Sequence, residues 1–62
     1  MPHVEITLLK GRTLEQKRKV AARITDVLVE EAGAKREDTT VAFLEVERES
    51  FAHAGVLVSD KR

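Results

Sequence analysis

Pro2 could serve as a base in proton-transfer chemistry if the initiator methionine is removed. Methionine is usually cleaved when the next residue is small, and the nitrogen of Pro2 would then be a secondary amine at the chain terminus. An ordinary α-amino group titrates at about 7.7 to 8, and apolar surroundings or a neighbouring cation lower that pKa. A neutral amine near physiological pH is a usable general base. The structural alternative is that Pro2 is incidental, the residue that happens to precede a strand.

Arg12 is the second candidate, because it follows Gly11 where the first predicted strand ends. A guanidinium binds a carboxylate through two hydrogen bonds and stabilises negative charge as an enolate develops. Arg12 is therefore a candidate group for binding an acidic substrate. The structural alternative is a solvated arginine at a strand end.

The elements that would carry these residues are a strand and a long helix. Alternation of apolar and polar residues predicts a strand over Val4–Leu9. Thr13 followed by Gln16 has the capping-box pattern, which predicts a helix from Leu14, and Gly33 is suited to end it. Five charged residues are expected to lie largely off the apolar stripe of this helix: Lys17, Lys19, Arg23, Asp26 and Glu30. The stripe consists of Leu14, Val20, Ala21, Ile24, Val27 and Leu28.

A second strand is predicted over Thr40–Val46, after a polar connector at 34–38. Two strands joined by a helix of this length indicate a β-α-β unit with a parallel pair and a right-handed crossover. The last residues, 49–62, are expected to form a short hairpin or arm around Gly55. The predicted class is α+β, with residues 1–62 as a single domain.

A chain of 62 residues without cysteine needs another source of burial. A domain of this size buries only about 60% of its unfolded surface, and a two-stranded sheet leaves its edges and one face uncovered. Pairing two copies edge to edge would give a four-stranded sheet with two helices. We therefore expect a homo-oligomer.

The charged residues argue against several other classes of protein. Eleven basic residues are interspersed with eleven acidic ones, so no basic patch for nucleic acid or an anionic membrane is expected. The chain lacks the layout of a signal peptide and any long apolar run, which indicates a cytoplasmic protein. His3 and His53 are the only histidines, too few for the usual metal site.

The sequence resembles the 4-oxalocrotonate tautomerase family along essentially its whole length, most clearly in the first third. The matching features are Pro2, "LLKGR" at 8–12, Thr13, and "EQK" at 15–17. The resemblance implies a β-α-β protomer assembled as a hexamer, a trimer of dimers. It also implies that Pro2 is a base that moves a proton between atoms of an enol or dienol acid, such as 2-hydroxymuconate. Such a reaction requires neither a metal nor an organic cofactor.

Further site residues follow from the resemblance, together with one departure from the family. Arg12 would bind a substrate carboxylate, and Phe51 would be an apolar wall that keeps the amine unprotonated. Thr40 stands where well-studied members have a second arginine, so Arg36 or Arg48 would have to substitute. A hydroxyl can donate a hydrogen bond but brings no charge.

The segment after the phenylalanine departs as well, because Ala52, His53 and Ala54 precede Gly55. A residue with a Cβ restricts the backbone wherever positive φ is needed. His53 is a candidate for the mouth of the site, with exposure to solvent as the alternative.

Two other functions stay open. The departure at Thr40 allows a proline-based dehalogenase, hydratase or decarboxylase of a small acid, or a non-catalytic assembly or binding protein on the same scaffold. No spacing singles out any one of the carboxylates of Glu5, Asp38, Glu45 and Glu47 as a further site residue.

Pro2 and Arg12 would lie roughly 30 Å apart at about 3.3 Å per residue. If both act on one substrate, a neighbouring subunit would have to supply one of them.

Overall fold

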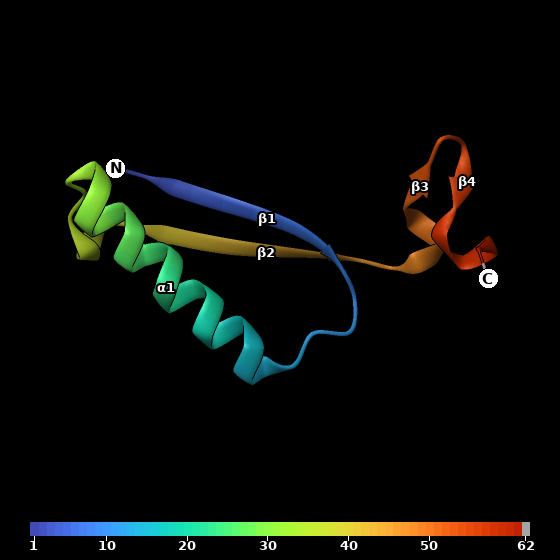
Figure 1. Ribbon diagram of the computed structural model, residues 1–62, viewed down its shortest axis with the longest axis horizontal. Helices are drawn as coiled ribbons and strands as arrows, with labels where there is room; N and C mark the ends of the chain where they lie inside the picture. Colours follow the sequence, from blue (N-terminus) through green and yellow to red (C-terminus); the bar gives the residue numbers. More distant parts are fainter. Residues whose placement is uncertain (62) are drawn as a thin grey trace.

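Two parallel strands and one helix form the body of the protein. The computed structural model describes residues 1–61, with β1 at His3–Leu9, α1 at Leu14–Ala32 and β2 at Thr40–Val46 (Figure 1). The strands pair in parallel register, from His3 opposite Thr40 to Leu9 opposite Val46. The predicted β-α-β unit is confirmed, with β1 beginning one residue earlier than expected.

Both ends of α1 follow from local hydrogen bonding. The Thr13 hydroxyl accepts the Gln16 N–H at 3.1 Å, and the Gln16 side chain accepts the Thr13 N–H at 2.9 Å. Gly33 ends the helix with a φ of 69°, which favours glycine. Both predicted ends are therefore confirmed. Although α1 has 19 residues, no helix among residues 1–61 is apolar enough to cross a membrane.

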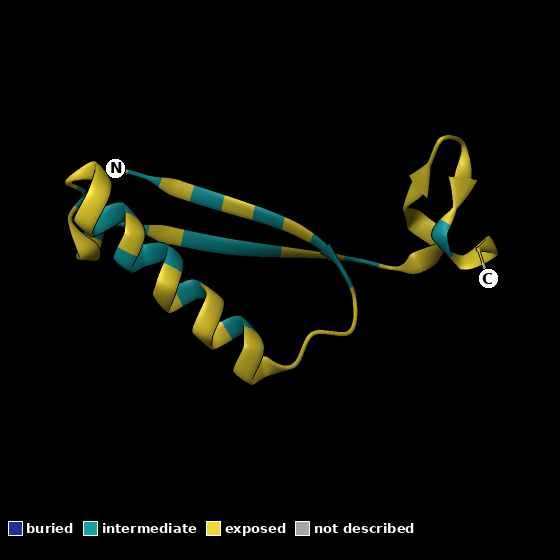
Figure 2. Ribbon diagram, in the orientation of Figure 1, coloured by how far each residue is buried: buried dark blue, intermediate teal, exposed yellow. Residues whose placement is uncertain are grey.

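The apolar stripe of α1 is wider than the two strands can cover. Ala21, Ile24 and Leu28 are half-buried. Leu14 and Val27 belong to the same stripe but stay 62% and 55% exposed. Part of the apolar face of α1 is thus left uncovered by the sheet of its own protomer (Figure 2).

Lys17 corrects one expectation, because it lies on the sheet side of the helix rather than off the stripe. Its Nζ is 2.9 Å from Glu45 Oε1, and the two side chains are only 25% and 28% exposed. The aliphatic part of a lysine can pack over apolar surface while its ammonium group binds a carboxylate. A charge was therefore compatible with the inner face of α1.

The protomer has no buried core of its own. None of residues 1–61 is fully buried (Figure 2). The accessible surface is 5018 Å², whereas a compact monomer of this mass exposes about 4000 Å². The radius of gyration is 14.8 Å, against about 11 Å for a compact domain of this length. The fold thus exposes more surface than a chain of this size does when it folds alone.

An arm follows β2 and extends away from α1 (Figure 1). A 3₁₀ turn at Arg48–Ser50 leads into a hairpin of β3, Ala52–His53, and β4, Val56–Leu57, and a second 3₁₀ turn at Val58–Asp60 follows. The hairpin predicted around Gly55 is confirmed. Ala54 and Gly55 have φ of 52° and 82°, which suits a two-residue turn of type I′. Alanine therefore adopts the left-handed conformation that glycine would adopt more readily.

Candidate active site

Pro2 lies directly before β1, where the first residue of β2 holds it in place. It is half-buried, and its carbonyl oxygen accepts the Thr40 N–H at 3.1 Å. Met1 is 93% exposed. While Met1 is present, the nitrogen of Pro2 is an amide, and removal of this exposed residue would convert it to an amine.

His3 joins Pro2 and Thr40 in a polar cluster at this end of the sheet. His3 Nδ1 lies 2.6 Å from Thr40 Oγ1, and His3 Nε2 lies 3.4 Å from Glu5 Oε1. These contacts were not predicted from the sequence. The signal was present in the alternation of β1, which puts His3 and Glu5 on the face opposite Val4.

The protonation of His3 determines what the Thr40 hydroxyl can do. A neutral ring with a bare Nδ1 accepts the hydroxyl proton of Thr40, which is then unavailable to a substrate. A doubly protonated ring donates to Thr40 Oγ1 instead and frees that proton. Thr40 stands where the family resemblance leads us to expect a second arginine. Its hydroxyl is instead hydrogen-bonded to the imidazole of His3.

The other end of β1 carries Arg12, on a turn fixed to the segment after β2. Gly11 makes this turn with a φ of 134°. The Lys10 N–H donates to the Val46 carbonyl oxygen at 2.9 Å, and Lys10 Nζ lies 2.8 Å from Glu47 Oε1. The hydrogen bond and charge of Glu47 raise the pKa of Lys10 above its ordinary value of 10.5. Backbone and side-chain contacts thus hold the two segments together.

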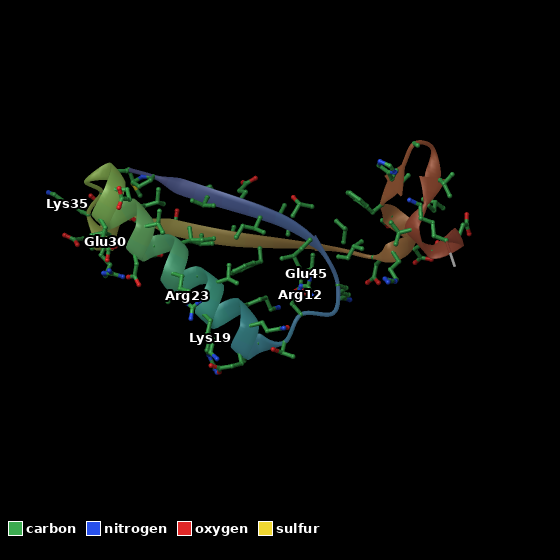
Figure 3. The ribbon with its side chains drawn as sticks, viewed as in Figure 1. Arg12, Lys19, Arg23, Glu30, Lys35 and Glu45 are labelled. Carbon is green, nitrogen blue, oxygen red and sulfur yellow. The ribbon has the colours of Figure 1, made fainter. Side chains whose placement is uncertain are left out.

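A hollow of about 260 Å³ lies at this junction and brings two arginines together. Its lining residues are Leu9, Lys10, Gly11, Arg12 and Arg48. Arg12 projects from the bend between β1 and α1 (Figure 3). Among residues 1–61, neither Arg12 nor Arg48 forms an ion pair. Arg36 instead binds Asp26 at 2.7 Å, so Arg48 is the one of the two expected substitutes that lies beside Arg12.

Phe51 and His53 lie in the arm, at the opposite end of the protomer from the N-terminus (Figure 1). Phe51 is 45% exposed, and its carbonyl oxygen accepts the Val58 N–H at 2.8 Å. His53 is exposed on β3. One protomer therefore brings Pro2 to Thr40 and Arg12 to Arg48, but the seven residues of β1 separate the two pairs by roughly 20 Å at the usual rise per residue.

Comparisons with known proteins agree with this architecture. Residues 2–61 match the family model described as tautomerase enzyme. The chain is 38% identical to a 2-hydroxymuconate tautomerase of Bacillus subtilis (strain 168) over 60 residues, 97% of each chain. It is also 38% identical to a 2-hydroxymuconate tautomerase of Pseudomonas putida over 56 residues, 90% of this chain and 89% of the relative.

Solved structures share the fold over the whole chain. The crystal structure of a 4-oxalocrotonate tautomerase homologue superposes with a TM-score of 0.93 at 39% identity, covering 100% of this chain and 98% of that one. A heterohexamer 4-oxalocrotonate tautomerase from Chloroflexus aurantiacus has the same fold, with a TM-score of 0.93 at 22% identity and full coverage of both chains. The chain thus belongs to the 4-oxalocrotonate tautomerase family of the tautomerase superfamily and is an isomerase.

Proposed function

We propose that this protein interconverts the enol and keto forms of a small 2-hydroxy-dienoate or 2-oxo acid, such as 2-hydroxymuconate, with the amine of Pro2 as general base. The observation that carries the proposal is the half-buried Pro2, hydrogen-bonded to Thr40 behind an exposed Met1. The names of the Bacillus subtilis and Pseudomonas putida relatives support 2-hydroxymuconate as the first substrate to test.

The reaction moves one proton and leaves the oxidation state unchanged. The amine of Pro2 takes the proton of the 2-hydroxyl group, and the negative charge spreads along the conjugated chain of the substrate. The resulting ammonium returns the proton to C3 in a 1,3-transfer or to C5 in a 1,5-transfer. Arg12 binds a substrate carboxylate. Phe51 limits solvation of the amine, which favours its neutral form.

The proposed site forms between protomers, because Pro2 and Arg12 lie at opposite ends of β1. In a closed two-fold dimer the same sheet edge meets itself, so the paired strands run antiparallel. This arrangement brings the Pro2 end of one protomer toward the Arg12 end of its partner. The uncovered apolar side chains of α1 favour such an assembly.

The proposal includes a homohexamer, a trimer of dimers in which each dimer has a four-stranded sheet and two helices. The family resemblance is its main support. The heterohexamer from Chloroflexus aurantiacus shares this fold.

The test has two steps. Intact-mass measurement first determines whether Met1 has been removed. Ketonisation of 2-hydroxymuconate and phenylenolpyruvate is then followed in the ultraviolet for the wild type and for Pro2→Ala. Pro2→Ala replaces the secondary amine of the proline ring with a primary amine on a less constrained residue, and we expect it to lower kcat by about 10²-fold or more. Equal rates for the two proteins would show that the ring amine of Pro2 is not required.

A further inference from the structure

The hollow at the ends of β1 and β2 has a fixed frame. Its volume is about 260 Å³. Pockets that enclose drug-sized ligands are slightly larger, at about 300–1000 Å³. The backbone bond from Lys10 to Val46 and the ion pair between Lys10 and Glu47 hold its two sides together. The hollow is therefore large enough for a small acid of a few carbon atoms.

The charges around the hollow do not cancel. Glu47 binds Lys10, so this pair contributes little net charge. Glu45 binds Lys17 and is likewise occupied. Arg12 and Arg48 form no ion pair among residues 1–61. Arg12 and Arg48 thus both line one small space, and no carboxylate among residues 1–61 forms an ion pair with either of them.

We propose that Arg48 is a specificity-determining residue, and that together with Arg12 it selects small acids with two carboxylates over those with one. Each guanidinium group can bind a carboxylate through two hydrogen bonds. A monocarboxylate would leave one of the two charges unbalanced, whereas a dicarboxylate balances both. The inference deepens the proposed function and depends on it only for the reaction that follows binding.

Fumarate and crotonate are matched probes, because crotonate has a methyl group in place of the second carboxylate of fumarate. Their binding to the full chain is measured by isothermal titration calorimetry at low ionic strength. The wild type should bind fumarate about tenfold more tightly or better, as expected for one additional charge-assisted contact. Arg48→Gln should weaken fumarate binding by about tenfold and crotonate binding by less than about threefold.

Two controls distinguish a local contact from a general change in charge. Arg23→Gln removes the same charge from the outer side of α1 (Figure 3) and should change the affinity for neither acid. Arg48→Lys keeps the charge and should retain the preference for fumarate. Circular dichroism and sedimentation confirm that each variant folds and assembles like the wild type.

Three results would overturn the proposal. These are no preference for fumarate in the wild type, an equal loss of both acids in Arg48→Gln, or the same loss in Arg23→Gln. The probes lack the 2-hydroxyl proton that the proposed reaction transfers, so their binding does not depend on the basicity of Pro2. If the protein showed no tautomerase activity, the proposed function would be contradicted. The difference in affinity between fumarate and crotonate would still test the role of Arg48.

Discussion

His3 Nδ1 lies 2.6 Å from Thr40 Oγ1, one residue away from the hydrogen bond between the Thr40 N–H and the Pro2 carbonyl oxygen. The side chain and backbone of Thr40 therefore hold two consecutive residues at the start of the protein. Thr40 supplies no charge where an arginine was expected from the family. It anchors the N-terminal end of β1 against β2.

The contact between His3 and Thr40 should be measurable as a coupling energy. We expect His3→Ala and Thr40→Val to be non-additive by about 0.5–1.5 kcal/mol, the usual net contribution of one hydrogen bond. Thr40→Val keeps the backbone bond to Pro2, so the strand pairing should persist. The measurement is urea unfolding of both single variants and the double variant at one fixed protein concentration. Additive effects would show that the side-chain contact contributes nothing to stability.

Most of the fold could be predicted because its signals are local. Thr13 and Gln16 hydrogen-bond to each other's backbone, and Gly33 adopts a conformation that favours glycine, so both ends of α1 depend on a few neighbouring residues. A connection long enough to hold this helix then favours a parallel pair of strands. The hairpin was predictable for the same reason, although an alanine at position 54 was an unfavourable sign for its tight turn.

The features that were missed depend on contacts distant in the sequence. Arg48 lies beside Arg12 only because the register of β1 and β2 aligns the segments that follow them. β2 is nearly continuous in strand-forming residues, so its pattern does not determine that register. Leu14 and Val27 belong to the predicted apolar stripe but remain exposed in the protomer. The periodicity of apolar residues predicts which face of a helix is buried, but it does not predict whether the same chain or another subunit buries it.

A site shared between protomers should be restored by mixing two inactive variants. Pro2→Ala and Arg12→Ala are unfolded together in equal amounts, refolded, and assayed with 2-hydroxymuconate. If each site takes Pro2 from one protomer and Arg12 from its two-fold partner, random pairing restores about a quarter of the wild-type activity. Each variant refolded alone is the control. Activity no higher than the average of the two controls would indicate that both residues act within one protomer.

The thermal stability should depend on protein concentration. Since none of residues 1–61 is buried within the protomer, folding and association are expected to be coupled. We expect the apparent Tm to rise steadily over a hundredfold increase in protein concentration, with sedimentation showing one assembled species. A Tm independent of concentration, together with a stable monomer, would contradict this expectation.

The contact between Lys10 and Glu47 should be visible in a pH titration. The hydrogen bond and charge of Glu47 raise the pKa of Lys10, so its titration should be centred above 10.5. A raised folded-state pKa means that the contact stabilises the fold fully below the unfolded value near 10.5 and is lost as pH rises through the folded value. Glu47→Gln should shift the Lys10 titration back toward 10.5, as followed by NMR at the side-chain Cε.

Glu30→Gln is the matched control for this titration. It removes a carboxylate from α1 (Figure 3), and Glu30 does not line the hollow between Arg12 and Arg48. It should leave the titration of Lys10 unchanged. An equal shift in both variants would indicate a response to overall charge rather than a specific ion pair. In that case the contact between Lys10 and Glu47 would not hold the turn that carries Arg12.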